Sequence, residues 1–362
     1  MKPAISAIIH GQPAISFKPP AMPHGRTISN EPSLTPDWAP FPMDFKNFQY
    51  FSSVNQVIAT GESNQNAFFH GSTWMAYWPC NEVECCAGNV NRFMPNLAAR
   101  MWMRTPAGGL VAALYGPSVE SIAVNGGTNK LCVTEATNYP FSDSVAFTFK
   151  TARPVTLPFM FRIPGWCEKP RVTINGDAYS GATVPGTFVT VQWEFRDGDT
   201  VVVTLPMKTK LVKWDRYGFF VERGPLLFTY PVPEKVTVDT KVYPNLKGKK
   251  AWNPDFPALD IRPNGPWNYA LDIDPARVDT QVCVVMNNTT GYPFDPGSVP
   301  LVLKVPAHRV EGWELDQNRY TPHVPQPPKV TGAEKTETIT LVPYGSTRLR
   351  LTVFPSTVAA KP

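Results

Sequence analysis

Short β-rich runs separated by turn residues follow one another along most of this chain. Between residues 105 and 212 the runs are GGLVAALYG, SIAVNGG, KLCVTEATNYP, DSVAFTFK, VTLPFMFRIPG, RVTING and TFVTVQWEFRDGDTVVVTLPM. Asn-Gly, Asp-Gly and Pro-Gly pairs interrupt them roughly every dozen residues, a spacing typical of an antiparallel sandwich. We therefore predict one β-sandwich domain over residues 105–212.

Two of these turns make a prediction about the backbone. Gly176 follows Asn175, and Gly198 follows Asp197, each between two β-rich runs. A tight hairpin at such a point needs a residue with positive φ, which glycine supplies without a steric penalty. We expect both glycines to adopt positive φ.

A second β-rich region extends from 213 to 356. Its clearest strands are YGFFVERGPLLFTYPV, VCVVMNN, SVPLVLKVPAHRV and TITLVPYGSTRLRLTVFP. The predicted fold class is therefore mainly β, with two consecutive antiparallel β-sandwich domains. Many unrelated functions use this architecture, so the fold by itself does not identify an activity.

Proline content supports the same fold class. The chain has 40 Pro among 362 residues, roughly twice the average usage, and proline interrupts helix interiors. Long helical repeats and coiled coils are excluded on this ground. The chain is 43% hydrophobic and 12% aromatic, which supplies a core and argues against disorder.

The N-terminal region has a different pattern. Residues 1–45 are Pro-rich and weakly periodic, which predicts an irregular arm. Residues 46–104 are rich in aromatic and amide side chains and end in NVNRFMPNLAARMWM, where Phe93, Leu97 and Met101 recur at helical spacing. We predict one helix there, with Pro95 either in its first turn or at a kink.

Charge and hydropathy exclude two classes of partner. The net charge is +5, but Lys and Arg are scattered and form no stripe that could follow a phosphate backbone, so we expect no nucleic-acid partner. No run approaches the ~20 apolar residues of a membrane span, so we expect no membrane partner. The start has no convincing signal-peptide cleavage site, which makes a cytoplasmic location the default expectation.

The densest group of reactive side chains lies in YWPCNEVECCAGNVNR, which holds Cys80, Glu82, Glu84, Cys85 and Cys86. Thiolates and carboxylates are zinc ligands, and a thiolate near a helix N-terminus has a lowered pKa. Spacing alone leaves three interpretations open: a nucleophile, a closed structural zinc site, or packed thiols beside exposed carboxylates. A bond between adjacent Cys85 and Cys86 would close a strained ring.

The segment Cys85-Cys86-Ala87-Gly88-Asn89, followed by Arg92, resembles the twin-cysteine motif of glycoside hydrolase family 127, the β-L-arabinofuranosidases and their relatives. Further features of that family follow in order: LYGPS at 114–118, TNYP at 137–140, FRIPGW at 161–166, Asn175-Gly176, Trp193 with Gly198-Asp199, ERGP at 222–225, WNYAL at 267–271 and LVPYGSTRLRLTVFP at 341–355. The resemblance spans roughly residues 46–356.

This resemblance implies a retaining, zinc-dependent glycosidase acting on non-reducing-end β-L-arabinofuranosides in a carbohydrate. Cys85 corresponds to the thiolate nucleophile and, with Cys86, to ligands of one Zn²⁺. In that chemistry the sulfur attacks the anomeric carbon, and the glycosyl-cysteine is then hydrolysed. The thiolate takes the place of the second carboxylate of most glycosidases.

The family also has a long helical (α/α) barrel before the twin cysteines, and residues 1–84 are too few to supply it. We therefore expect residues 46–104 to be a remnant of that barrel, with the chain weakly active or inactive unless a second copy or a complementing chain completes the site. His70 is a candidate sugar contact, although a lone His in an aromatic run is more often structural. The alternative is a non-catalytic β-sandwich protein that binds glycans or a partner chain.

Ten tryptophans are compatible with sugar stacking, but most should be core residues. Trp74, Trp78 and Trp102 flank the cysteine motif and are candidates for facing the barrel. Trp166, Trp193 and Trp214 fit packing within the sandwiches.

Overall fold

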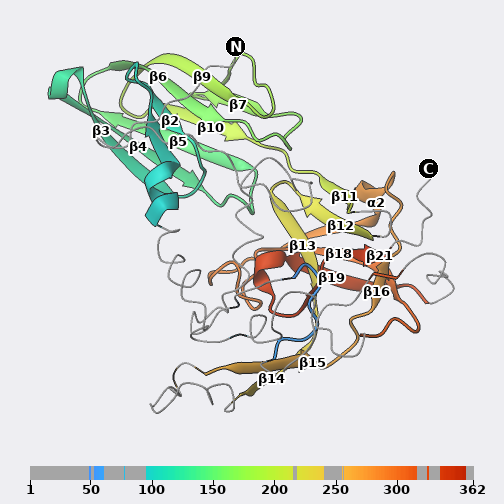
Figure 1. The fold of residues 1–362 in the computed structure, drawn as a ribbon. Coiled ribbons are helices and arrows are strands. Elements are labelled where there is room, and N and C mark those ends of the chain that lie inside the picture. Colours follow the sequence, from blue (N-terminus) through green and yellow to red (C-terminus); the bar gives the residue numbers. More distant parts are fainter. Residues whose placement is uncertain are drawn as a thin grey trace. The chain divides into compact units, whose positions relative to one another are not determined.

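The computed structural model describes residues 49, 53–60, 77, 95–214, 218–239, 255, 257–315, 324–325 and 335–355. The chain is mainly β, as predicted, and it divides into two compact units (Figure 1). Of the residues that the structure describes, those within Val90–Met207 belong to the first unit, and those within Ser33–Asn89 and Lys208–Pro362 belong to the second.

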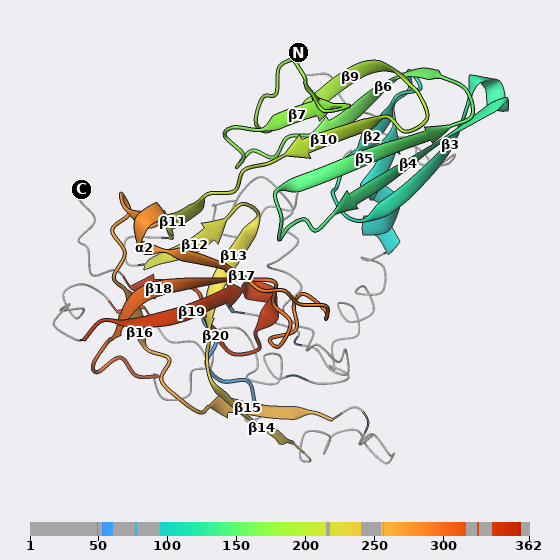
Figure 2. The same cartoon turned by 180° about the vertical axis from the view of Figure 1, so that it is seen from behind.

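Two sheets form the first unit. Their orders are β1-β2-β6-β9 and β3-β4-β5-β10-β7-β8, and all pairs are antiparallel except β2 with β6. The elements are β1 Trp102–Arg104, β2 Leu110–Ala112, β3 Ser118–Val124, η2 Asn125–Gly127, β4 Asn129–Thr137, β5 Ser144–Thr151, β6 Val155–Arg162, β7 Arg171–Ile174, β8 Asp177–Ala178, β9 Phe188–Phe195 and β10 Thr200–Thr204. The meander of β3, β4 and β5 is visible in Figure 2.

One apolar core joins the two sheets, and this arrangement makes the first unit a sandwich. Alternate residues of β5 and β6 face inward, as period-2 patterning requires. Phe159 of β6 meets Phe147 and Phe149 of β5 edge to face, with ring centroids 5.1 and 5.2 Å apart. Phe149 also stacks on Phe195 of β9 at 3.9 Å.

The predicted turn glycines have the expected conformation. Asn175 and Gly176 have φ of 52° and 91°, and they join β7 to β8 in a two-residue hairpin. Gly198 has φ of 86° in the turn between β9 and β10. Both predictions of positive φ are confirmed.

Residues 95–101 are helical, which confirms the predicted helix for its described part. Trp102 then begins β1 and packs on the first core, against Phe147 and Phe159. The indole of Trp102 thus contributes to the packing of the sandwich. Trp74 and Trp78 lie outside the described residues, so the barrel-facing expectation for these tryptophans stays a prediction.

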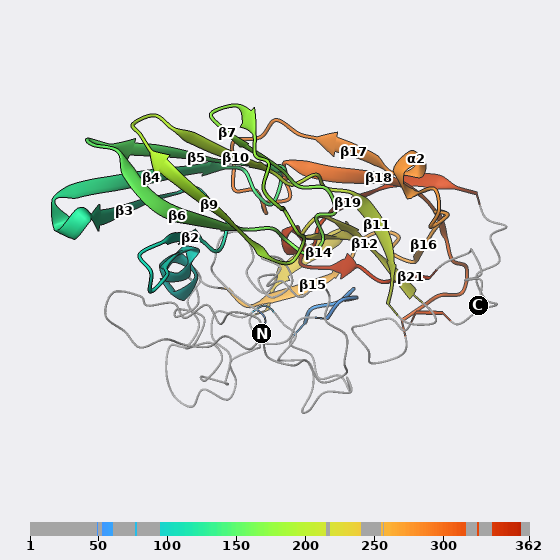
Figure 3. The ribbon, with the colours of Figure 1, turned by 90° about the horizontal axis from the view of Figure 1, so that it is seen from above.

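A nine-stranded sheet dominates the second unit. Its path is β11-β12-β13-β19-β18-β16, with β17 on β18, β20 on β13 and β21 on β12. The elements are β11 Thr209–Lys213, β12 Gly218–Arg223, β13 Leu226–Pro231, β14 Glu234–Val238, β15 Leu259–Pro263, β16 Tyr269–Leu271, α2 Val278–Gln281, β17 Cys283–Met286, β18 Leu301–Arg309, β19 Glu337–Pro343, η3 Tyr344–Ser346, β20 Arg350–Leu351 and β21 Phe354–Pro355. The β14–β15 ribbon forms a separate sheet, and α2 lies beside β11 (Figure 3).

N-terminal residues complete this second unit with extended backbone. Gln56 pairs with Arg350, Ala59 with Ile261, and Tyr77 with Leu259. Val57, Ala59 and Tyr77 are fully buried in a cluster with residues of β15. Described residues 53–60 and 77 of the segment 46–104 are therefore built into the second unit.

None of the helices in the described residues has the length and apolarity that a membrane-spanning helix needs.

Candidate functional sites

The sequence-predicted catalytic and metal-binding residues lie outside the described residues. This holds for Cys85, Cys86 and His70, and also for the neighbouring Cys80, Glu82 and Glu84. Their roles stay predictions. Among the residues that the structure does describe, no group of three or more His, Cys, Asp or Glu side chains could hold a metal ion.

Among the described cysteines, Cys167 lacks the features of a reactive thiol. Cys132, Cys167 and Cys283 form no disulfide. Cys167 is completely buried, and burial raises the pKa of its thiol to about 11. A thiol with such a pKa is protonated at neutral pH and is a poor nucleophile.

A polar network connects Trp102, the residue that follows the helix at 95–101, with β3 and β4 of the sandwich. The indole Nε1 of Trp102 donates to Ser118 Oγ at 2.9 Å, and this hydroxyl donates to Glu135 Oε2 at 3.1 Å. The Gly116 N–H donates to the other carboxylate oxygen at 3.0 Å. Glu135 is only 2% exposed, and burial raises its pKa to about 7, although both hydrogen bonds oppose the shift.

Sequence reasoning did not single out Glu135. The available signal was the alternation along β4, in which Leu131 and Val133 face the core and Glu135 occupies the next inward position. A carboxyl group at an inward position predicts either a hydrogen-bonded network or a raised pKa, and here both occur.

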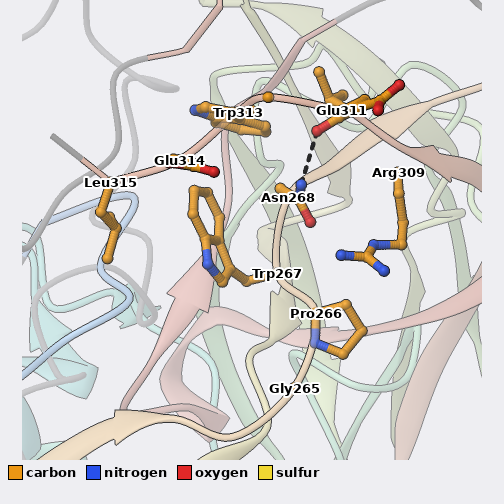
Figure 4. A pocket seen from close by; sticks show the side chains of 11 residues that line it. Gly265, Pro266, Trp267, Asn268, Arg309, Glu311, Trp313, Glu314 and Leu315 are labelled. Carbon is orange, nitrogen blue, oxygen red and sulfur yellow. Dashed lines mark hydrogen bonds between the residues drawn. The ribbon is translucent and has the colours of Figure 1, made fainter.

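The second unit contains an open pocket of about 780 Å³ at one end of its large sheet (Figure 4). Two tryptophans and four polar side chains stand out in its lining: Trp267, Asn268, Arg309, Glu311, Trp313 and Glu314. We call it the tryptophan pocket. In the sequence, Trp267 is part of WNYAL, which was noted only for its resemblance to the family. The sequence did not predict this pocket.

Strand register explains why these residues meet. β16 and β18 are antiparallel, with Tyr269 opposite Arg309. The residues just before β16 therefore lie beside those just after β18. Asn268 Nδ2 donates to the Val310 carbonyl at 2.7 Å, and the Val310 N–H donates back to the Asn268 carbonyl at 2.8 Å (Figure 4).

The two indoles differ in exposure. Trp313 is only 6% exposed, whereas Trp267 is half-buried and packs with one part against the cluster that holds Tyr77 and Ile261. The rings meet edge to face, with centroids 5.2 Å apart and planes inclined by 69°. Trp313 thus acts as a core residue that supports Trp267.

Comparison with known proteins finds a family model that matches part of the first unit. Residues 109–207 match the family model described as "Beta-L-arabinofuranosidase, GH127 middle domain". No curated protein sequence matches the chain at a significant level.

Solved structures extend the likeness over most of the chain. A glycoside hydrolase superposes with a TM-score of 0.60 and 19% identity, covering 89% of this chain and 46% of its own. A GH127 β-L-arabinofuranosidase from Geobacillus stearothermophilus T6 gives 0.56 and 18%, with coverages of 88% and 44%. A GH127 β-arabinofuranosidase gives 0.57 and 17%, with coverages of 90% and 44%.

At these identities the solved structures show a shared fold, and the chain spans less than half of their length. The ordered motifs, the matched middle domain and the shared fold agree with one another. The resemblance predicted from the sequence is therefore confirmed: residues 109–207 match the GH127 middle domain, and most of the chain shares the fold of GH127 structures.

Proposed function

We propose that the chain is the C-terminal portion of a retaining, zinc-dependent glycosidase that removes β-L-arabinofuranose from the non-reducing ends of glycans. The observation that carries this proposal is the GH127 middle-domain match at residues 109–207, which follows the twin cysteines along the chain. In this proposal Cys85 is the nucleophile, and Cys85 and Cys86 hold Zn²⁺. A bound zinc ion would keep both thiols deprotonated.

The test uses two readouts on the full chain. In an assay with an aryl β-L-arabinofuranoside and added zinc, we expect turnover to be weak, because the chain spans less than half of the related enzymes. Any turnover should fall to background in Cys85→Ala and stay unchanged in Cys283→Ala, which removes an exposed thiol.

The second readout does not need activity. Mass spectrometry after iodoacetamide treatment should show Cys85 and Cys86 protected in the presence of zinc and labelled after chelation. Cys283 is exposed and should be labelled in both states, which makes it an internal control. Equal labelling of Cys85 with and without zinc, or turnover that survives Cys85→Ala, would refute the proposal.

A second candidate function is non-catalytic binding of a glycan or a partner chain. The tryptophan pocket favours the glycan-binding form, because aromatic rings and exposed polar groups share one open site. A chain that binds arabino-oligosaccharides but hydrolyses none of them with zinc present would support this function. Light scattering would show whether the chain forms homo-oligomers.

A further inference from the structure

We infer that the tryptophan pocket of the second unit is a carbohydrate-binding site in its own right. Trp267 provides the platform for the C–H face of a sugar ring, and Arg309 and Glu314 provide partners for its hydroxyl groups. The identity of the sugar, an arabinofuranose unit, rests on the proposed function. The existence of the site rests on the geometry that follows.

Size and shape suit a sugar. The volume of about 780 Å³ lies within the range of about 300–1,000 Å³ that holds small ligands. The pocket is open to solvent, so a bound unit can remain part of a longer glycan. All the residues that line it belong to the second unit.

Partial exposure of Trp267 is the central observation. A tryptophan that served only the core would resemble Trp313, which is almost completely buried. Trp267 is instead only half-buried: it lines the pocket (Figure 4), and it also packs against the buried cluster that holds Tyr77 and Ile261. A flat apolar surface held in this way releases water when an apolar sugar face covers it.

The platform is rigid before any ligand arrives. The paired hydrogen bonds between Asn268 and Val310 fix the two loops to each other. The Tyr230 hydroxyl donates to the Pro266 carbonyl at 3.2 Å, and the Asn264 N–H donates to the Pro233 carbonyl at 2.7 Å. A preorganised site loses little conformational entropy on binding, and this favours the weak individual contacts of a sugar.

One turn residue directs Trp313 into place. Gly312 has φ of 69°, a left-handed conformation that side chains other than glycine rarely adopt. The chain reverses there between the end of β18 and Trp313, whose N–H donates to the Val310 carbonyl at 3.3 Å. The second loop therefore returns to brace Trp267.

Charge in the pocket selects a neutral, hydroxyl-rich ligand. Arg309, Glu311 and Glu314 are exposed on its lining and carry both signs. A phosphate group would meet two carboxylates there, whereas vicinal hydroxyls can donate to a carboxylate and accept from a guanidinium. The two charged types together fit a polyol better than an anion.

Calorimetric titration of the full chain tests the inference. The Cys85→Ala background prevents turnover, and the probes are methyl β-L-arabinofuranoside and β-linked arabino-oligosaccharides. We expect saturable binding that Trp267→Ala weakens by about tenfold or more, as the loss of a central tryptophan contact does. Trp214→Ala is the matched control, because Trp214 is 37% exposed on the same unit outside the pocket, and it should bind as the background does.

Exposed polar residues give a second test that does not disturb the core. Arg309→Ala and Glu314→Ala should each weaken binding severalfold with an unchanged melting temperature, and they decide the question if Trp267→Ala fails to fold. Absence of saturable binding, wild-type affinity in the pocket variants, or an equal loss in Trp214→Ala would overturn the inference. Hydrolysis depends on Cys85 and binding on Trp267, so failure of the proposed function and failure of this inference give different results.

Discussion

Glu135 couples a proton to the folding of the first unit. Its pKa is raised from 4.5 to about 7 by burial, so the folded state holds a proton that an unfolded carboxyl group releases above pH 4.5. The resulting stability is fully present below pH 4.5 and is lost as the pH rises through 7. At ~1.4 kcal/mol per pKa unit, this pKa difference lowers the free energy of unfolding by on the order of 3 kcal/mol between acidic and alkaline pH.

Replacement of Glu135 by Gln should remove this pH dependence. Urea unfolding of the wild-type chain should show the first unit losing stability as the pH rises from 4.5 to about 7, whereas Glu135→Gln should remove this pH dependence. Glu194→Gln is the control, because the Glu194 side chain is 52% exposed. An unchanged slope in Glu135→Gln would show that another group binds the proton.

Single residues were the hardest level to predict from the sequence. Burial of Glu135 depends on hydrogen bonds from Gly116 and Ser118, which lie 19 and 17 residues away along the chain. Trp166, Trp193 and Trp214 were all expected to pack within the sandwiches. Trp166 packs against the first core, whereas Trp193 and Trp214 are 39% and 37% exposed. An isolated aromatic residue does not reveal which side of a strand meets solvent, because edges and turns break the alternation.

At the scale of single elements, the turn of the β7–β8 hairpin allows the cost of a positive φ to be measured at Gly176. A Cβ on Gly176 would meet no atom within 4 Å, so only its φ of 91° opposes a side chain. Gly176→Ala should lower the free energy of unfolding by ~1 kcal/mol or more. Gly165→Ala, where φ is not positive and the nearest atom lies 4.0 Å away, should change it little. Equal effects of the two substitutions in urea titrations would contradict this explanation.

Strands and turns were largely predictable, because both depend on local sequence. Period-2 patterning and Asn-Gly or Asp-Gly pairs located the runs that became β4, β5 and β6 and the turns at Gly176 and Gly198. The parallel pairing of β2 with β6 was not predictable. It depends on contacts between segments distant in the chain, about which local propensity carries no information.

At the scale of the whole molecule, buried Arg350 ties the N-terminal part of the second unit to its C-terminal strands. Its guanidinium donates to the Ser53 carbonyl at 3.0 Å, to the Arg348 carbonyl at 3.1 Å and to Gln56 Oε1 at 3.3 Å. The side chain is fully buried and lies over the Tyr344 ring, 4.5 Å from the ring centroid. Several buried oxygens therefore depend on one planar cation.

Arg350→Lys should destabilise the second unit strongly, because an ammonium group cannot reach all these acceptors. We expect the free energy of unfolding to fall by ~3 kcal/mol or more, as when a buried polar network loses donors. Arg277→Lys keeps the same chemical change at an exposed position and should have little effect. A loss of stability no larger than that of the control, measured by urea unfolding, would refute the bridging role.

The resemblance to glycoside hydrolase family 127 could be predicted at this scale, because motifs from Asn175-Gly176 to LVPYGSTRLRLTVFP keep their order along the chain, and so could the mainly β class. The tryptophan pocket could not. Trp267 and Trp313 lie in different loops, and only the register of β16 with β18 brings them together. The contact between residues 53–60 and the strands near residue 350 could not be predicted either, because it joins segments that are far apart in the sequence.

The hydrogen bonds between Asn55 and the backbone near β20 can form only late in protein synthesis. Asn55 Oδ1 accepts from the Thr352 N–H, 297 residues later in the sequence. At typical translation rates of ~5–20 residues per second, Thr352 is added to the chain roughly 15–60 s after Asn55. All described strands of the first unit are translated by Met207, well before that partner. All described strands of the first sandwich are therefore made while the buried segment of the second unit, Val57 and Ala59 included, still lacks the strands that cover it.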